Sequence, residues 1–152
     1  MKRFAWILVL LLLLSACAQE VPEEEVAVFY YPLRTLEFGW DKTIFAEVTM
    51  AIDTVTTEQL LRQYIGRWSD EDYRNPFPAG TTLESVVLDG HSATVTLSES
   101  FAQLNGLELS IACTALAKTM HSLEGVTSVT IIAQGKMLDG KSAIIIDLNA
   151  LL

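Results

Sequence analysis

The spacing of apolar and polar positions changes along the chain from strand-like to helix-like and back. Residues 26–31 form a β-branched and aromatic run that Pro32 closes, and residues 43–52 form a second run in which apolar and polar positions roughly alternate. Runs of this composition are typical of β-strands. We therefore expect the folded part of the chain to open with two strands.

The period then becomes helical. Thr56 and Gln59 have the spacing of a capping box, in which two side chains satisfy backbone N–H groups at the start of a helix. The apolar residues that follow fall on one helical face: Leu60, Leu61, Tyr64, Ile65 and Trp68. We expect this helix to end around residues 66–69 and the acidic, proline-bearing stretch 69–80 to be an irregular loop.

A hairpin and a second helix come next. Residues 82–88 and 92–97 read as strands joined through Asp89-Gly90, a dipeptide favoured where both turn residues need positive φ. A helix is expected over residues 107–123, where apolar residues step by four and three to give one stripe: Leu109, Cys113, Leu116, Met120 and Leu123.

Gly125 is a plausible stop for this second helix, because glycine favours the left-handed conformation that ends many helices. Residues 126–133 then form a strong strand, and residues 143–148 form a further short one. The helix–strand–strand–helix–strand core predicts an α+β fold, with two amphipathic helices on one face of a mixed sheet of about four to six strands.

The first residues look like an export signal. Lys2 and Arg3 precede an apolar run over residues 4–14, which is too short for a stable membrane-spanning helix of roughly 20 residues. The sequence Leu-Ser-Ala-Cys over residues 14–17 resembles the lipobox of bacterial lipoproteins, in which Cys17 is lipid-modified and becomes the new N-terminus. A plain secretory signal with an incidental cysteine is the alternative.

We therefore divide the chain into a signal peptide (1–16), a lipid-attached acidic tether (17–25) and one domain (26–152). The expected location is the extracytoplasmic face of the cell membrane. The formal net charge of −9 argues against nucleic acid, which needs clustered Lys and Arg, and leaves the lipid as the only membrane attachment. Cys113, the one other cysteine, has no disulfide partner and fits a buried apolar position.

One stretch matches a nucleotide-binding signature. Residues 135–142 fit the phosphate-binding pattern G-x-x-x-x-G-K-[ST], which needs a helix directly after it so that the helix N-terminus faces the phosphates. The residues that follow are β-branched and strand-like. We interpret the stretch as a glycine-rich loop between two strands, with no nucleotide or other cofactor.

Other candidates for chemistry are few. His91 falls at the hairpin turn, and His121 lies near the end of the second helix, where Glu124 is spaced to share a metal but no further ligand is evident. Asp139 and Asp147 look like ordinary exposed carboxylates in the last loop and strand. We predict no catalytic residues, no metal site and no enzymatic activity, because nothing in the sequence points to an enzyme, although active sites can assemble from residues far apart in the chain.

Five aromatic residues near the start of the domain leave two interpretations open. They either line a ligand groove or fill and edge the sheet, and we favour the second: Phe29, Tyr30, Tyr31, Trp40 and Phe45.

The segment 78–101 resembles the GerMN domain of sporulation and spore germination proteins. It begins Pro-Ala-Gly-Thr-Thr-Leu, turns on Asp-Gly and closes with Leu-Ser-Glu-Ser-Phe. The likeness extends over residues 26–148, and it departs in the long acidic loop after Trp68. The resemblance implies a non-catalytic module, similar to ring-building motifs, that binds an envelope or sporulation-complex protein and can form homo-oligomers. Alternatives are a small-ligand, peptidoglycan- or glycan-binding lipoprotein and an accessory envelope enzyme.

Overall fold

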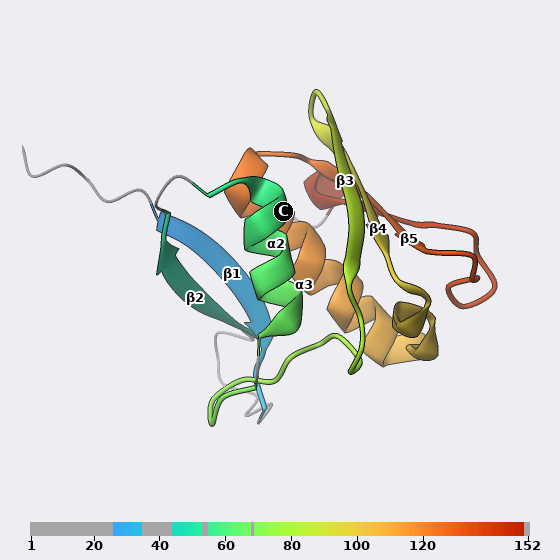
Figure 1. Cartoon of the computed structure of the whole chain (residues 1–152), viewed down its shortest axis with the longest axis horizontal. Helices are drawn as coiled ribbons and strands as arrows, with labels where there is room; N and C mark the ends of the chain where they lie inside the picture. Colours follow the sequence, from blue (N-terminus) through green and yellow to red (C-terminus); the bar gives the residue numbers. More distant parts are fainter. Residues whose placement is uncertain (1–25, 35–43, 53–54, 68, 151–152) are drawn as a thin grey trace, which may run out of the picture.

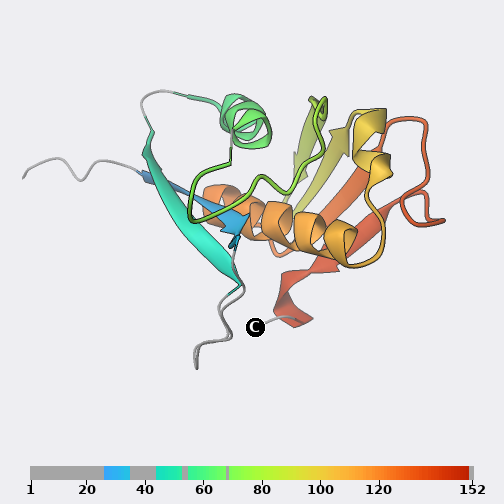
Figure 2. The ribbon, with the colours of Figure 1, turned by 90° about the horizontal axis from the view of Figure 1, so that it is seen from below.

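Three layers make up the fold, as Figures 1 and 2 show: a two-stranded sheet, a pair of helices and a four-stranded sheet. The computed structural model describes residues 26–34, 44–52, 55–67 and 69–150. The predictions for the signal peptide, the tether and Cys17 therefore lie outside the described residues.

The two strands expected at the start of the domain are confirmed. β1 (Val26–Pro32) and β2 (Phe45–Ala51) pair in antiparallel orientation along their whole length. They form a sheet of their own rather than joining the other strands. Ala27, Phe29 and Tyr31 of β1 are buried, because they face the helices.

The first helix, α2 (Thr57–Gly66), begins at the predicted capping box. The backbone N–H of Gln59 donates to the Thr56 hydroxyl oxygen at 3.3 Å, and the N–H of Thr56 donates to the Gln59 side-chain oxygen at 3.0 Å. The four described residues of the predicted apolar face are buried, and Trp68 lies outside the described residues. The stretch that follows is irregular, as expected. It contacts the end of β1 through a β-bridge between Leu33 and Tyr73 and through the Tyr73 ring, which stacks on Tyr31.

The larger sheet has the order β3-β4-β5-β6. β3 (Leu83–Asp89) and β4 (Ser92–Leu97) form the predicted hairpin, while β5 (Ser128–Ala133) pairs parallel to β4 and antiparallel to β6 (Ile144–Asp147). The sheet is therefore mixed. Two short 3-10 helices, η1 (Glu99–Gln103) and η2 (Leu148–Ala150), follow β4 and β6.

The turn of the hairpin differs by one residue from the prediction. Asp89 still pairs with Ser92, so the two turn residues are Gly90 and His91. Only Gly90 has a positive φ, at 56°. A two-residue turn with glycine at its first position and a positive φ only there is of type II′, so the prediction of positive φ at both turn residues was wrong.

The second helix, α3 (Gly106–Glu124), ends at Gly125 in the left-handed conformation, as expected, with φ 65°. The predicted stripe is buried as far as Met120, and Leu123 is half-buried. The buried surface is wider than one stripe, because β1 packs on α3 from the side opposite the larger sheet. The additional buried residues are Ala112, Ala115, Ala117 and Thr119.

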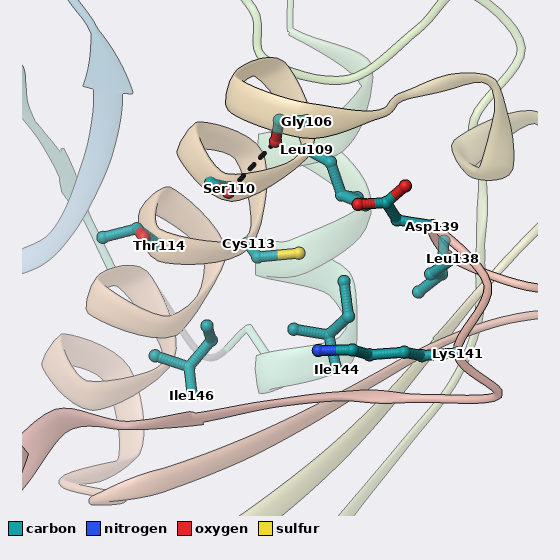
Figure 3. Close-up of a pocket in the computed structure, with 10 residues that line it drawn as sticks. All are labelled: Gly106, Leu109, Ser110, Cys113, Thr114, Leu138, Asp139, Lys141, Ile144 and Ile146. Carbon is teal, nitrogen blue, oxygen red and sulfur yellow. Dashed lines mark hydrogen bonds between the residues drawn. The ribbon is translucent and has the colours of Figure 1, made fainter.

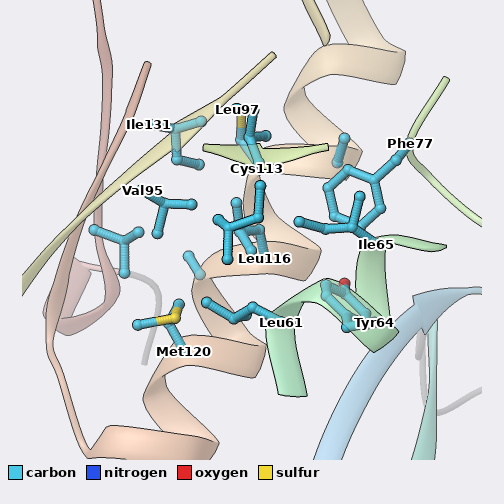
Figure 4. Packing of buried hydrophobic residues seen from close by; sticks show 14 of the residues in the cluster. Leu61, Tyr64, Ile65, Phe77, Val95, Leu97, Cys113, Leu116, Met120 and Ile131 are labelled. Atoms are coloured by element: carbon cyan, nitrogen blue, oxygen red, sulfur yellow. The ribbon is translucent and has the colours of Figure 1, made fainter. Parts of the chain in front are cut away.

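The core lies between the layers, where both helices contact the larger sheet (Figure 4). Leu61 of α2 and Leu116 and Met120 of α3 lie opposite Val95 and Ile131 of the sheet, and all five are essentially inaccessible to solvent. No helix among the described residues combines the length and apolar composition needed to cross a bilayer.

Candidate functional site

A pocket lies between the N-terminal half of α3 and the last strand, β6 (Figure 3). Its volume is about 190 Å³. Leu109, Cys113, Leu138, Ile144 and Ile146 form its apolar walls, and small or charged residues form the rest of its lining: Gly106, Ser110, Thr114, Asp139 and Lys141.

The wall between β5 and β6 is shaped by a tight turn. Leu138 and Lys141 exchange two backbone hydrogen bonds of 2.7 and 2.9 Å, which close the turn at Asp139-Gly140. Both turn residues have positive φ, 48° for Asp139 and 78° for Gly140, as a type I′ turn requires. This turn holds the Leu138 side chain in the core and keeps Asp139 and Lys141 at the rim of the pocket.

The same turn explains why the nucleotide-binding signature does not have its usual structure. The signature needs free backbone N–H groups and a helix N-terminus facing the phosphates. The N–H of Lys136 donates to the carbonyl of Ala133 at the end of β5, those of Leu138 and Lys141 donate to each other's carbonyls, and the element after the loop is β6, a strand. The predicted interpretation as a loop between two strands is confirmed.

Cys113 forms part of the pocket wall, but its thiol is poorly reactive. The residue is fully buried, and burial raises the pKa of the thiol to about 12. At neutral pH the thiol is therefore protonated, whereas nucleophilic attack and metal binding need the thiolate. The prediction of a small buried apolar residue is confirmed.

The opposite face of the larger sheet, here called the outer face, is uncovered. Both helices pack on the inner face, and none of the described segments lies over the outer one (Figure 2). The strand register places Val87, Thr94, Thr130 and Ile145 in one row across all four strands. Val87 is 59% exposed and Ile145 68% exposed, so two large apolar side chains stand at the ends of a threonine row.

A second row of residues, at one end of the outer face, contains two acidic side chains. Asp89, Ser92, Ser128 and Asp147 lie side by side in register. No Lys or Arg occurs in any of these four strands. The outer face is therefore uncharged in the middle and negative at one end.

The structure places the two histidines at the hairpin turn and in the last turn of α3. His91 is exposed at the hairpin turn, and its carbonyl oxygen accepts the N–H groups of Thr127 and Ser128 at 2.8 and 3.2 Å. The Nδ1 of His121 lies 2.9 Å from the carbonyl oxygen of Val126, beyond the end of α3. Glu124 contacts the hydroxyl of Thr57 instead of sharing a ligand with His121. Among the described residues, no three His, Cys, Asp or Glu side chains are placed to hold a metal ion.

The described aromatic residues fill the sheet, as the favoured interpretation expected. Phe29, Tyr31 and Phe45 are buried, and Tyr31 lies 4.9 Å from the ring of Tyr64 between centroids. Burial raises the pKa of the Tyr31 hydroxyl. Tyr30 is half-buried beneath the Lys118 ammonium group, and Trp40 lies outside the described residues.

Sequence reasoning missed the polar lining of the pocket. Ser110 and Thr114 are spaced one helical turn apart on α3. In the sequence Asp139 reads as an ordinary exposed carboxylate beside Asp147, and Lys141 reads as part of the nucleotide-binding signature. The one sequence signal for this pocket is that small polar residues, Ser110 and Thr114, lie beside the apolar stripe of the helix. These residues indicate a pocket only once the structure shows that β6 lies next to them.

Comparisons with known proteins agree on one family. The family model named Germane, described as sporulation and spore germination, matches residues 29–139. The first GerMN domain of the sporulation protein GerM from Bacillus subtilis is 14% identical, with a TM-score of 0.56, over 80% of this chain and 95% of that domain.

The tandem GerMN domains of the same Bacillus subtilis protein also match. They give a TM-score of 0.56 at 16% identity, over 81% of this chain, which spans 45% of the tandem's length. A search of the curated proteins gave no match. At these identities the solved structures support the fold, and the family model supports the family.

Proposed function

Because the chain belongs to the Germane family of sporulation and spore germination domains, we propose that it is a lipid-anchored protein on the extracytoplasmic face of the cell membrane. In this proposal its domain is a non-catalytic module that binds another protein of an envelope, sporulation or germination complex. Lipid attachment at Cys17 is proposed from the lipobox-like sequence at residues 14–17.

The observation that carries the binding role is the uncovered outer face. Exposed apolar side chains that gather on one face of a soluble domain often mark a protein-binding site. Here Val87 and Ile145 flank the uncharged Thr94 and Thr130, while the inner-facing residues of the two central strands, Ala93, Val95, Val129 and Ile131, are buried. A partner surface can therefore lie flat on this face without displacing any described segment.

The test changes the middle of the outer face. In Thr130→Lys, a long charged side chain stands where a partner must approach, and the half-exposed position lets the lysine reach solvent. The matched control is Thr49→Lys, the same change at an exposed position of β2 in the other sheet. We expect Thr130→Lys to lose capture of the envelope partner and complementation in the cell, and Thr49→Lys to retain both.

Two further variants separate binding from chemistry. His91→Ala and His121→Ala remove the imidazole groups, which are the ionisable side chains best suited to acid–base work at neutral pH. We expect both to complement normally while the circular dichroism spectrum stays that of the folded protein. Loss of function in either folded variant, with Thr130→Lys still active, contradicts the proposal and favours an enzyme or a metal site.

A further inference from the structure

The two edges of the larger sheet differ in how they are protected. β3 has a register shift between Leu83 and Ser85, carries the charged Glu84 in that irregularity, and its Leu83 carbonyl oxygen accepts a hydrogen bond from Arg62 at 2.8 Å. Bulges and charges of this kind prevent pairing with other strands. β6 is three consecutive isoleucines followed by Asp147, with no proline, lysine or bulge, and among the described strands only β5 pairs with it.

The register of β6 shows which backbone groups remain available. The N–H of Leu148 donates to the carbonyl oxygen of Thr127 at 2.9 Å. In an antiparallel ladder the hydrogen-bonded residues alternate, so Ile146 and Ile144 also face β5 with their backbone groups. The N–H and C=O of Ile145 consequently point away from β5, toward the open edge.

The pocket lies directly beneath this open edge. Ile144 and Ile146 line it from β6, and Ser110 and Thr114 line it from α3 on the opposite side. A strand added next to β6 continues the pleat of the sheet, and its alternate side chains point toward α3. Those side chains would enter the pocket of about 190 Å³, and an apolar cavity of roughly 150 Å³ already holds a benzene ring.

We propose that β6 and the pocket beneath it bind an extended segment of a partner protein, which adds a strand to the sheet and places an aliphatic or aromatic side chain in the pocket. The inference rests on the proposed function, because it states how one class of partner is recognised. Strand addition of this kind takes affinity from backbone hydrogen bonds and specificity from pockets for alternate side chains.

The negative charge of this chain favours binding of a basic partner segment over pairing with a second copy of the chain. Asp139 lies in the turn that precedes β6 and Asp147 is the last residue of β6, and Lys141 is the single Lys or Arg between them in the sequence. The chain has a net charge of −9, so two copies repel each other while a segment flanked by Lys or Arg is attracted. The segment that fits has apolar residues at alternate positions and basic residues at its ends.

The probe is a fluorescein-labelled, capped peptide of sequence KTITITK, titrated with the full chain in detergent micelles and followed by fluorescence anisotropy. Its two isoleucines share one side and can face the pocket. Control peptides are KTSTSTK, which lacks the apolar side chains at the same charge, and ETITITE, which reverses the flanking charge. We expect saturable binding of KTITITK and at least about tenfold weaker binding of both controls.

Two variants test the edge and the pocket separately. Ile145→Pro removes an N–H that points away from β5, so the β5–β6 ladder is retained, and Ile145→Thr is its control because it keeps that N–H. Ser110→Leu fills the pocket, and Ser122→Leu makes the same change at an exposed position of α3 outside the pocket. We expect at least about a tenfold loss of affinity from Ile145→Pro and Ser110→Leu, and little change from the controls.

Two outcomes overturn the inference. One is that KTITITK does not bind at protein concentrations up to about 1 mM, and the other is that it binds but neither Ile145→Pro nor Ser110→Leu weakens the binding. Circular dichroism and the NMR spectrum of the backbone amides establish that each variant is folded. If the peptide fails while Thr130→Lys still abolishes partner capture, the inference is wrong and the proposed function stands. If capture of the partner is insensitive to Thr130→Lys, the proposed function itself is wrong.

Discussion

The contact between β1 and α3 depends on one buried hydroxyl, and replacing Thr119 with valine tests its role. The Tyr30 N–H donates to the Thr119 Oγ1 at 3.0 Å, and the Tyr64 hydroxyl donates to the Tyr30 carbonyl oxygen at 2.7 Å. Thr119 is fully buried. Two helices thus satisfy the backbone groups of Tyr30 on the side of β1 that faces away from β2.

The expected cost follows from this geometry. Valine has nearly the shape of threonine, so the packing changes little, but the Tyr30 N–H loses its acceptor in a place that water reaches poorly. An unsatisfied buried donor costs about 1 to 3 kcal/mol. We expect Thr119→Val to lower the free energy of unfolding by that amount, which for a domain of this size lowers Tm by roughly 3 to 6 °C per kcal/mol.

Thr119→Ser is the matched control. Serine keeps the oxygen and loses one methyl group, whose burial is worth about 0.8 kcal/mol. Urea unfolding gives the free energies, and hydrogen exchange at the Tyr30 amide separates the two causes. Exchange should accelerate in Thr119→Val and stay close to wild type in Thr119→Ser once global stability is taken into account. A Thr119→Val protein with an unchanged urea midpoint and a protected Tyr30 amide would refute the reasoning.

Three further predictions concern other parts of the chain. Cys17→Ser should move the protein from the membrane fraction to the soluble fraction or leave it unprocessed, and mass spectrometry showing an unmodified Cys17 in the mature wild type would contradict lipid attachment. Calorimetric titration with ATP and magnesium should give no saturable heat, because three of the loop's N–H groups donate to backbone carbonyls and a strand follows the loop, and micromolar binding that Lys141→Ala abolishes would show otherwise. Burial raises the pKa of the Cys113 thiol from 9.0 to about 12, so its contribution to the free energy of unfolding is complete below pH 9 and is lost as the pH rises toward 12. Urea unfolding at increasing pH should therefore show that the free energy of unfolding falls less steeply with pH in Cys113→Ala than in wild type, by up to about 1.4 kcal/mol per pH unit. An equal fall with pH in the two proteins would mean that burial does not raise the pKa of the thiol.

Local signals in the sequence determined most of the secondary structure. The capping box at Thr56, the alternation in residues 92–97 and the glycine at 125 each depend on contacts within a few residues, so they can be read from neighbours alone. The same holds for the core positions of β4 and α3, because burial on one face leaves a period in the sequence. The hairpin turn was misplaced by one residue because Asp-Gly fits more than one turn type, and the register of the strands decides between them.

What required the tertiary structure is the relation between elements that are distant in the chain. The separation of β1 and β2 into their own sheet follows from their packing against α3, and no local pattern distinguishes this from a strand at the edge of one large sheet. The pocket likewise exists only because α3 and β6, which are distant in the chain, lie side by side and line it together.

The available surfaces were decided in the same way. Val87 and Ile145 are far apart in sequence, and they share a row only through the pairing of four strands. Both β3 and β6 read as strands in the sequence, but only the structure shows that they are the edges of the sheet and that one is interrupted and the other open. The sequence by itself determined the elements and the faces they bury, since those depend on short-range periodicity. The tertiary structure decided which edge and which face remain exposed, since that depends on what the rest of the chain leaves uncovered.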